Sequence, residues 1–403
     1  MLASCANLAT TNGVLIATEN LLESTPLPPI ISVSYGECEA FNGTVANQTW
    51  YALFQLAAAQ GVSAFVASGD SLGGVCDRSV PAAHGLGVSG YASTPYDVAV
   101  GGTDFADTYL NNSASYWSTS NNAYYGSAAS YVPEIPWNDS CASGLVTAYA
   151  GYATAYGPTG FCNSLGTSVN TTYLLQASGG SGGQSSCAVG VPATQGVVGG
   201  TCLGWAKPYW QAVAGNPADG VRDLPDVSLF AALGVAWSHC LSVCDSHSKA
   251  CVSQTPSTWS CGGGTSFAAP IMAGIQALIN QRMGGRQGNP NPVYYAIANA
   301  QYGPTGNSNC DASLGNSINP ACVFHDVTLG DMVAPCVTAY DCFLDGATFG
   351  VLSLSTNAYV PAFSAATGWD FATGIGTVNV SNLVESFSYS HLLLGSRHRH
   401  AGK

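Results

Sequence analysis

Residues 30–67 read IISVSYGECEAFNGTVANQTWYALFQLAAAQGVSAFVA, and this stretch decides the fold. Residues 30–35 form a β-branched run, residues 49–60 carry apolar side chains at helical spacing, and residues 62–67 form a second run typical of a buried strand. A strand, a helix and a strand within about forty residues predict a βαβ unit, because parallel strands need a crossover connection. The sequence therefore predicts an α/β fold with a mainly parallel sheet.

Two further segments extend this prediction. Residues 96–100 predict a third strand. Residues 264–283 read GTSFAAPIMAGIQALINQRM and are apolar on nearly every face, so we expect a buried helix. Pro270 would lie in its first turns, and Gly284-Gly285 would end it. Helices are thus expected to flank the central sheet.

The composition limits the functions that are open to the chain. It has 403 residues, of which 47% are hydrophobic, enough to bury the core of one large domain or two ordinary ones. Only 8% of residues are charged, and 9 Lys and Arg against 22 Asp and Glu give a net charge of −13. No broad basic face exists to bind nucleic acid. A protein with so few cations has few ion pairs to lose in acid, which suits an acidic compartment.

Cysteines and glycosylation sequons indicate the secretory pathway. The chain has 15 cysteines, and its Asn-x-Ser/Thr sequons lie at Asn42, Asn47, Asn111, Asn138, Asn170 and Asn379. We therefore expect an extracellular protein, or one from a lysosome-like or vacuole-like acidic compartment. No apolar run reaches the roughly 18 residues of a membrane span, and the first residues lack the pattern of a signal peptide. Together with the odd cysteine count, this predicts that the true beginning of the protein is missing.

Residues 104–200 are rich in Tyr, Ser, Asn, Gly and Ala and carry the scattered cysteines Cys141, Cys162, Cys187 and Cys202. This composition predicts long surface loops that are joined by disulfides. A second cluster follows at Cys240, Cys244, Cys251 and Cys261. Zinc is one interpretation of that cluster, but the spacing fits no zinc finger and favours disulfides. We expect residues 1–385 to form one domain and the basic residues 386–403 to form a frayed tail.

A glycine-rich loop leads into the predicted long helix and places a serine at its start. Residues 262–266 read GGGTS, so the Ser266 hydroxyl would lie in the positive field of the helix N-terminus, beside free backbone N–H groups. A nucleophile and its oxyanion need this environment. A serine that merely caps a core helix is the alternative.

The same serine motif resembles that of two peptidase families. Residues 264–270, GTSFAAP, resemble the G-T-S-x-x-x-P motif shared by subtilisins and by sedolisins, the acid-acting serine-carboxyl peptidases. The resemblance implies a subtilisin-like three-layer α/β fold. Subtilisins take their base from a histidine in an H-G-T-x-V-A-G segment and place an asparagine in the oxyanion hole. Sedolisins use a glutamate as base with a helper aspartate, and place an aspartate in that hole.

The residues after the second predicted strand favour the sedolisins. Residues 67–71, ASGDS, resemble the sedolisin A-x-G-D-S turn, and Asp70 would lie at the carboxyl end of a strand, where open α/β sheets place their chemistry. An ionised carboxylate would repel an oxyanion, so Asp70 acts only when it is protonated and donates a hydrogen bond. The alternative is an aspartate that forms the turn after a strand.

Histidine is a poor candidate for the base. The chain has seven histidines, none in a subtilisin-type segment: His84, His239, His247, His325, His391, His398 and His400. His84, in AAHG, comes closest, but it follows the aspartate motif, which is the wrong order for a subtilisin base. We interpret His84 as a loop residue. A subtilisin that uses histidine is the weakest interpretation of the chain.

The resemblance to sedolisins extends from about residue 14 to residue 378, with a poor match in 104–200. Three further segments carry it: SVSYG at 32–36, which resembles the strand bordering the substrate cleft, GGT at 101–103, and PDV at 225–227.

Two later segments, FHDVT at 324–328 and GWDFATGIG at 368–376, resemble the calcium site of the family. The resemblance implies one Ca²⁺ bound by the Asp326 and Asp370 side chains and by three carbonyls, those of Val327, Ala366 and Gly368. Carboxylates with several carbonyls suit this cation. Two aspartates that cap turns independently are the alternative.

The sedolisin base is not evident in the chain. The family carries its glutamate and helper aspartate as E-x-x-x-D on one helix, and the resemblance implies that this chain begins just after that helix. Glu19 and Glu23 stand four residues apart, but they directly precede residues 24–26 and the first strand, so they lie in the wrong helix. We interpret these two glutamates as a solvated helix face.

Two hypotheses follow. The first is a secreted or lysosome-like acidic peptidase, an endopeptidase or tripeptidyl-peptidase, in which Ser266 attacks the peptide carbonyl, Asp70 stabilises the oxyanion and an upstream glutamate takes the proton. The second is a calcium-stabilised, glycosylated pseudopeptidase that binds peptides without cleaving them. Both predict a monomer that has a peptide or protein partner, with neither nucleic acid nor a membrane span.

Overall fold

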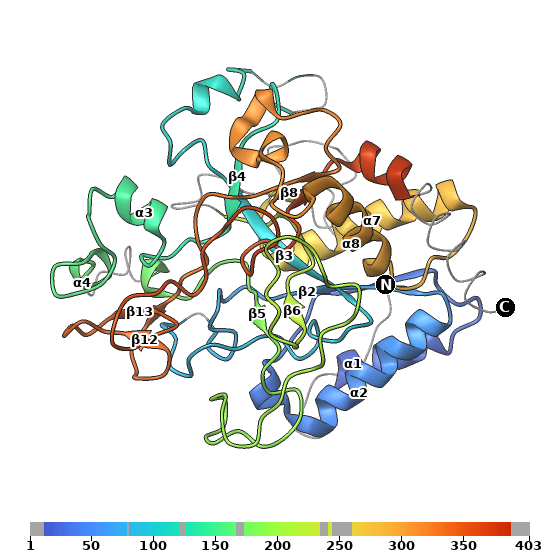
Figure 1. The fold of residues 1–403 in the computed structure, drawn as a ribbon, viewed down its shortest axis with the longest axis horizontal. Helices are drawn as coiled ribbons and strands as arrows, with labels where there is room; N and C mark the ends of the chain where they lie inside the picture. The colour runs from blue at the N-terminus through green and yellow to red at the C-terminus, as the bar shows by residue number, and fades with distance from the viewer. Residues whose placement is uncertain are drawn as a thin grey trace.

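The computed structural model describes residues 12–78, 80–120, 122, 126–166, 173–233, 241–243 and 260–387 (Figure 1). The labelled helices are α1 (Gly13–Leu22), α2 (Glu39–Ala59), α3 (Gly144–Tyr149), α4 (Phe161–Ser164), α7 (Thr265–Met283) and α8 (Asn291–Tyr302), and residues 380–387 form a further helix. The central sheet consists of β1 (Ile30–Val33), β2 (Ser63–Ala67), β3 (Val98–Phe105), β4 (Glu134–Pro136) and β7 (Val227–Phe230).

Four strands of this sheet are parallel, in the order β1-β2-β3-β7. β4 is antiparallel to β3. Val100 pairs with Ala67 on one side and Val227 on the other, whereas Thr103 pairs with Pro136 of β4 and with β7. β4 therefore continues the line of β2, beyond the point where β2 ends. The predicted parallel sheet is confirmed.

The sheet is the middle layer of three. Successive residues of β2 point to opposite faces, as the period of a strand requires. Phe65 and Ala67 are buried in a core with α7 and α8, whereas Ala64 and Val66 are buried in a second core with α2 and the end of α1. Figure 1 shows these two helix pairs on opposite sides of the strands. The predicted three-layer α/β fold is confirmed.

The two long helices differ in part from the prediction. α2 begins ten residues before the predicted segment at residue 49 and is interrupted by Gly43, whose φ is +77°. α7 covers the predicted range and ends at Gly284, which has a left-handed φ of +73°. The expectation that α7 is buried all round is wrong, because Ile271 and Leu278 are 44% and 48% exposed. α7 lies in an outer layer, so only one of its faces packs against the sheet.

The loops are joined by disulfides, as predicted. Five disulfides link described cysteines: Cys38–Cys76, Cys141–Cys162, Cys187–Cys202, Cys310–Cys322 and Cys336–Cys342. Cys261 is also disulfide-bonded, which argues against its role as a zinc ligand. Cys240, Cys244, Cys251 and most of the predicted tail at 386–403 lie outside the described residues. Among the helices that are described, none is long and apolar enough to cross a bilayer.

Short sheets complete the fold: β5 (Gly183–Gln184) with β6 (Asp223–Leu224), β8 (Leu241–Val243) with β9 (Ser260–Gly262), β10 (Phe324–His325) with β14 (Thr377–Val378), and β11 (Pro335–Cys336) with β13 (Gly350–Leu352) and β12 (Cys342–Phe343). The 3-10 turns are η1 (Ser113–Ser115), η2 (Tyr173–Leu175), η5 (Ser308–Cys310) and η6 (Ala312–Ser317). Residues 104–200 contain only short elements, in keeping with the predicted loops.

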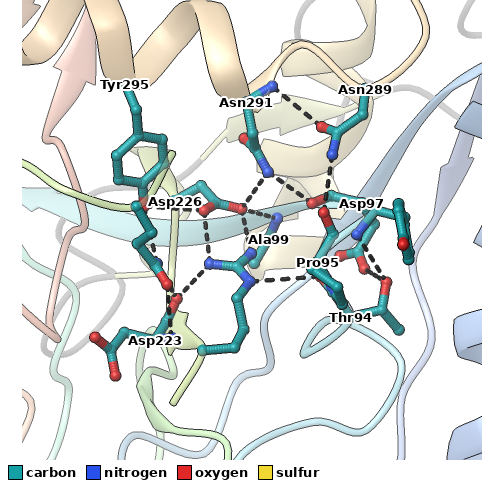
Figure 2. Close-up of polar contacts among 12 residues, drawn as sticks. Thr94, Pro95, Asp97, Ala99, Asp223, Asp226, Asn289, Asn291 and Tyr295 are labelled. Atoms are coloured by element: carbon teal, nitrogen blue, oxygen red, sulfur yellow. Dashed lines mark hydrogen bonds and ion pairs between the residues drawn. The ribbon is translucent and has the colours of Figure 1, made fainter. Parts of the chain in front are cut away.

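A buried ion pair joins the sheet to α8 (Figure 2). The Arg222 guanidinium donates to both oxygens of Asp226, at 2.8 and 2.6 Å, and both side chains have 0% exposure. Asp226 also accepts hydrogen bonds from the Ala99 N–H in β3 and from Asn291 and Tyr295 in α8. Removal of one partner would leave a buried charge uncompensated, at a cost of about 3–5 kcal/mol. The PDV motif at 225–227 therefore has a structural role.

Two of the predicted glycosylation sites are buried. The Asn47 amide, with 0% exposure, donates to the carbonyls of Glu39, Cys187 and Ala188. The Asn138 amide, with 5% exposure, donates to Asp331 and Val333. The glycan attachment atom is this same amide nitrogen, so the folded protein cannot be modified at either position. A sequon is a three-residue pattern that carries no information about tertiary contacts, so the burial of these two asparagines could not be predicted from it.

Candidate active site

A cleft of about 290 Å³ contains both predicted catalytic residues. Asp70 follows the carboxyl end of β2, and Ser266 is the second residue of α7. Residues 34–36, directly after β1, form another part of the lining. The carboxyl ends of neighbouring parallel strands meet at one edge of a sheet, and here the start of α7 reaches the same edge.

Asp70 is bound directly to the residue before Ser266. Its Oδ1 accepts hydrogen bonds from the Thr265 N–H at 2.7 Å and from the Thr265 hydroxyl at 2.8 Å. Among the described residues, Oδ2 of Asp70 accepts no hydrogen bond. Gly264 allows this approach: its φ is +117°, and a Cβ there would lie 2.9 Å from Oδ2. Asp70 therefore bonds to α7 rather than merely forming its own turn.

The environment of Asp70 favours a protonated carboxyl group. Removal from water raises the pKa of Asp70, and the two hydrogen bonds from Thr265 oppose this rise. Since Oδ1 already accepts both hydrogen bonds, a proton on the carboxyl group would be carried by Oδ2. The protonated group could then donate a hydrogen bond into the cleft.

Ser266 does not cap the helix. The N-cap residue of α7 is Gly264, and no described side chain caps the helix. In the part of the chain that is described, the Ser266 hydroxyl and N–H have no hydrogen-bond partner, whereas its carbonyl accepts a bond of 2.8 Å from the Ser34 hydroxyl. The alternative of a capping serine is therefore wrong. The geometry leaves the hydroxyl and the N–H available to a ligand at the positive end of α7.

A second glycine-rich segment, which was not predicted from the sequence, supports the Asp70 turn. Residues 179–183 read GGSGG. The Gly179 N–H donates to the Asp70 carbonyl at 3.2 Å, and the Ser181 hydroxyl accepts from the Ser71 N–H at 3.0 Å. A Cβ on Gly180 would lie 2.8 Å from the Gly102 carbonyl oxygen, so the segment needs glycine there. The run of glycines at residues 179–183 is the sequence feature that could have indicated this supporting role.

The described lining of the cleft includes no histidine, and no carboxylate other than Asp70. His84 lies elsewhere: its Nδ1 is 2.7 Å from Oδ1 of Asp77, and its ring packs edge-on against Phe41. Glu19 and Glu23 are exposed at the end of α1 and do not line the cleft. A general base is thus not found among these residues.

Asp326 and Asp370 lie close together, as the sequence predicted for the metal site. Oδ2 of Asp326 accepts from the Gly368 N–H at 2.8 Å, and Oδ2 of Asp370 accepts from the Ala366 N–H at 2.9 Å. Burial raises the pKa of Asp326 to about 8, and the Asp370 carboxylate adds to this rise. Asp370 also caps its own turn by accepting from the Thr373 N–H.

Several oxygens at this position are without a donor. Oδ1 of Asp326 is buried and has no hydrogen-bond partner among the residues that the structure describes. The carbonyls of Val327, Ala366 and Gly368 accept no hydrogen bond from the described part of the chain. A buried carboxylate oxygen and three free carbonyls are a donor set that fits a hard cation. No cluster of three or more His, Cys, Asp or Glu side chains occurs in the described regions, so such a site would depend on these carbonyls.

The fold and the cleft define the class of protein: a three-layer α/β fold in which a serine at the start of a long helix lies beside an aspartate from the end of a core strand. No family model matches the chain. Sedolisin from Pseudomonas sp. (strain 101) is 25% identical over 390 residues, which are 95% of this chain and 45% of that protein. The chain thus spans about half the length of this relative.

A solved structure agrees with the sequence comparison. Pseudomonas sedolisin, a serine-carboxyl proteinase complexed with two molecules of pseudo-iodotyrostatin, matches with a TM-score of 0.54 and 22% identity, over 94% of this chain and 71% of that chain. The chain is therefore a homologue of sedolisin, and the predicted resemblance is confirmed.

Proposed function

We propose that the protein is a serine-type peptidase that hydrolyses peptide bonds at acidic pH, as an endopeptidase or a tripeptidyl-peptidase. The observation that carries this proposal is the arrangement in the cleft. Among the described residues the Ser266 hydroxyl, at the start of α7, has no partner, and Asp70, bound to Thr265, has a carboxyl oxygen available for an oxyanion. Homology to a serine-carboxyl proteinase supports the same reaction class.

Ser266 would act as the nucleophile. Its Oγ forms a bond to the carbonyl carbon, and its proton passes to a carboxylate base outside the described residues. The oxyanion accepts hydrogen bonds from the Ser266 N–H and from the Oδ2–H of protonated Asp70. The C–N bond then breaks as the amine takes the proton from the base. Water hydrolyses the acyl-enzyme ester by the reverse sequence of proton transfers.

We also propose one calcium ion at Asp326 and Asp370, with the carbonyls of Val327, Ala366 and Gly368 as further ligands. The unpaired oxygens at this position support the ion. When bound, Ca²⁺ would neutralise two buried carboxylates and hold residues 366–370 against the end of β10. Its role would be structural.

A non-catalytic peptide-binding protein is the second candidate. The observation that favours it is the lack of a second carboxylate in the described cleft, since a serine without a base is a poor nucleophile. Both candidates are proposed to act as monomers outside the cell or in an acidic lysosome-like compartment. The disulfides support such an oxidising environment.

Peptide hydrolysis by the whole protein between about pH 3 and pH 8 tests the function. Wild type is compared with Ser266→Ala and with Ser118→Ala, an exposed serine that does not line the cleft. Acidic activity that only Ser266→Ala abolishes is the expected result. Peptide binding without hydrolysis would support the second candidate. Hydrolysis that survives in Ser266→Ala would contradict the proposed nucleophile.

A further inference from the structure

The cleft that holds Ser266 and Asp70 also contains a cation, Arg78. Its guanidinium Nη2 donates to the Gly36 carbonyl and lies 3.5 Å from Oε2 of Glu37. The Arg78 side chain is 55% exposed. The proposed hydrolysis does not use this residue, and no motif in the local sequence indicates it.

Cations are scarce in this protein, with 9 Lys and Arg in 403 residues. Among the described ones, Lys207 and Arg222 are ion-paired with aspartates. Arg282 and Arg286 lie at or beyond the carboxyl end of α7, about 25 Å along the helix from Ser266. Arg78 is therefore the cation that the described structure places in the cleft.

Part of the Arg78 guanidinium is available to a ligand. Both of its hydrogen bonds come from Nη2, so Nε and Nη1 have no partner within the described regions. The pair with Glu37 is exposed, with 55% and 40% of the two side chains accessible, and such pairs contribute only about 0–1 kcal/mol. An entering carboxylate can therefore compete for the guanidinium, which binds carboxylates through two parallel hydrogen bonds.

The rest of the cleft accommodates such a group. Much of its lining is small and uncharged, as in Ala67, Gly69, Ser71 and Ser89. In acid, Asp70 would be neutral in the proposed reaction. A ligand carboxylate near Arg78 would then have to displace the exposed Glu37 carboxylate from the guanidinium, and no described lining residue would repel it.

The position of Arg78 limits which part of a peptide it can reach. The Ser34 hydroxyl donates to the Ser266 carbonyl, and Arg78 donates to the Gly36 carbonyl. Two residues of chain span at most about 7 Å. Residues 34–36 thus contact both the Ser266 backbone and the guanidinium, and all of them line the same cleft.

We propose that Arg78 determines substrate specificity by binding the carboxylate of an aspartate or glutamate side chain within about two residues of the scissile bond. This inference rests on the proposed peptide-binding cleft and adds the class of substrate. The protein would prefer acidic peptides, although its own net charge is −13.

Pairs of peptides that differ only in Glu or Gln at one position near the cleavage site test this inference in the whole protein. At about pH 5 most glutamate side chains are ionised. We expect a preference for Glu of about five- to tenfold in kcat/KM, mainly through KM, which disappears in Arg78→Gln. Arg78→Glu should instead favour the peptide with Lys at the same position. Arg286→Gln is the matched control, an exposed arginine whose guanidinium also donates to a carbonyl, and it should retain the preference for Glu.

Binding of the same peptides to Ser266→Ala separates this inference from the proposed hydrolysis. Fluorescence anisotropy that shows tighter binding of the Glu peptide, and loss of the difference in Arg78→Gln on the same background, supports the role of Arg78 even if no peptide is cleaved. Cleavage or binding without a Glu preference at any position would overturn the role of Arg78 and leave the peptidase proposal intact.

Discussion

Thr265 donates two hydrogen bonds to the same carboxyl oxygen of Asp70, one from its N–H at 2.7 Å and one from its hydroxyl at 2.8 Å. This contact joins the end of β2 to the start of α7. Because Ser266 follows Thr265 directly, the contact fixes the proposed nucleophile relative to the proposed oxyanion residue. It also leaves the second oxygen of Asp70 unbonded among the described residues.

Thr265→Val tests how this contact controls the pH dependence. The hydroxyl favours the ionised form of Asp70, so its loss should raise the pKa of Asp70 further. Asp70 would stay protonated to higher pH. The alkaline limb of the pH profile of kcat/KM should therefore shift to higher pH by about 0.5–1 pH unit. Thr265→Ser retains the hydroxyl and should leave the limb in place. A downward shift in Thr265→Val would contradict the role of Asp70.

Gly264→Ala should remove activity more than it lowers stability. The φ of +117° disfavours any side chain, at a cost of about 1–3 kcal/mol, and the new Cβ would lie 2.9 Å from Oδ2 of Asp70. Gly284→Ala is the control, because φ there is +73° and the Cβ would meet nothing within 4 Å. Thermal unfolding and peptide hydrolysis should show two destabilised variants, of which only Gly264→Ala is inactive. Full activity in Gly264→Ala would contradict the proposed role of the Asp70 oxygen.

Calcium should stabilise the protein against unfolding. After treatment with EDTA, calorimetric titration is expected to detect one ion, and at 100 times Kd the ion would add about 2.7 kcal/mol to the free energy of unfolding. Asp326→Asn should weaken binding. Asp311→Asn should retain it, because both Asp311 oxygens already accept hydrogen bonds, from Ser313 and Thr328. An unchanged melting temperature in calcium would mean that the two aspartates only cap turns.

The protein should be more stable in acid than at neutral pH. Glu134 is 7% exposed, and burial raises its pKa from the ordinary 4.5. A carboxyl group with a raised folded-state pKa stabilises the fold below its unfolded pKa, and this contribution is lost as the pH rises through the folded value. The midpoint of urea unfolding should therefore fall between pH 4.5 and neutrality.

Glu134→Gln should reduce this decrease in the midpoint of urea unfolding with rising pH. The partners of Glu134 are the hydroxyls of Thr103, Tyr131 and Thr377, which can reorient to accept from an amide. Glu23→Gln, at an exposed position at the end of α1, should leave the pH dependence of unfolding unchanged. Equal pH dependence in wild type and Glu134→Gln would show that another group is responsible.

Much of the fold could be predicted because its strands have a local signature. β2 is a run of apolar residues that is buried on both faces, so the sequence alone identifies it. Ser266 and Asp70 could be located for a similar reason, since each follows a short motif at the end of a predicted element. The exposed face of α7 could not be predicted, because an apolar helix in an outer layer has the same sequence pattern as a fully buried one.

Other features depend on contacts between distant residues. Arg78 lines the cleft because its loop folds back over Gly36, 42 positions earlier in the chain. The buried state of Asn138 depends on Val333, 195 positions away. Neither contact leaves a pattern in the local sequence. The glycine run at 179–183 was visible, but its contact with the Asp70 turn was not.

Covalent labelling of Ser266 tests the central claim most directly. The whole protein is treated with a serine-directed fluorophosphonate, and the labelled peptide is identified by mass spectrometry. We predict an adduct on Ser266 near pH 4 that is absent in Ser266→Ala, weakened in Asp70→Ala and reduced at pH 8 in wild type. No adduct on Ser266 at any pH, or equal labelling at pH 4 and pH 8, would contradict a nucleophile that depends on protonated Asp70.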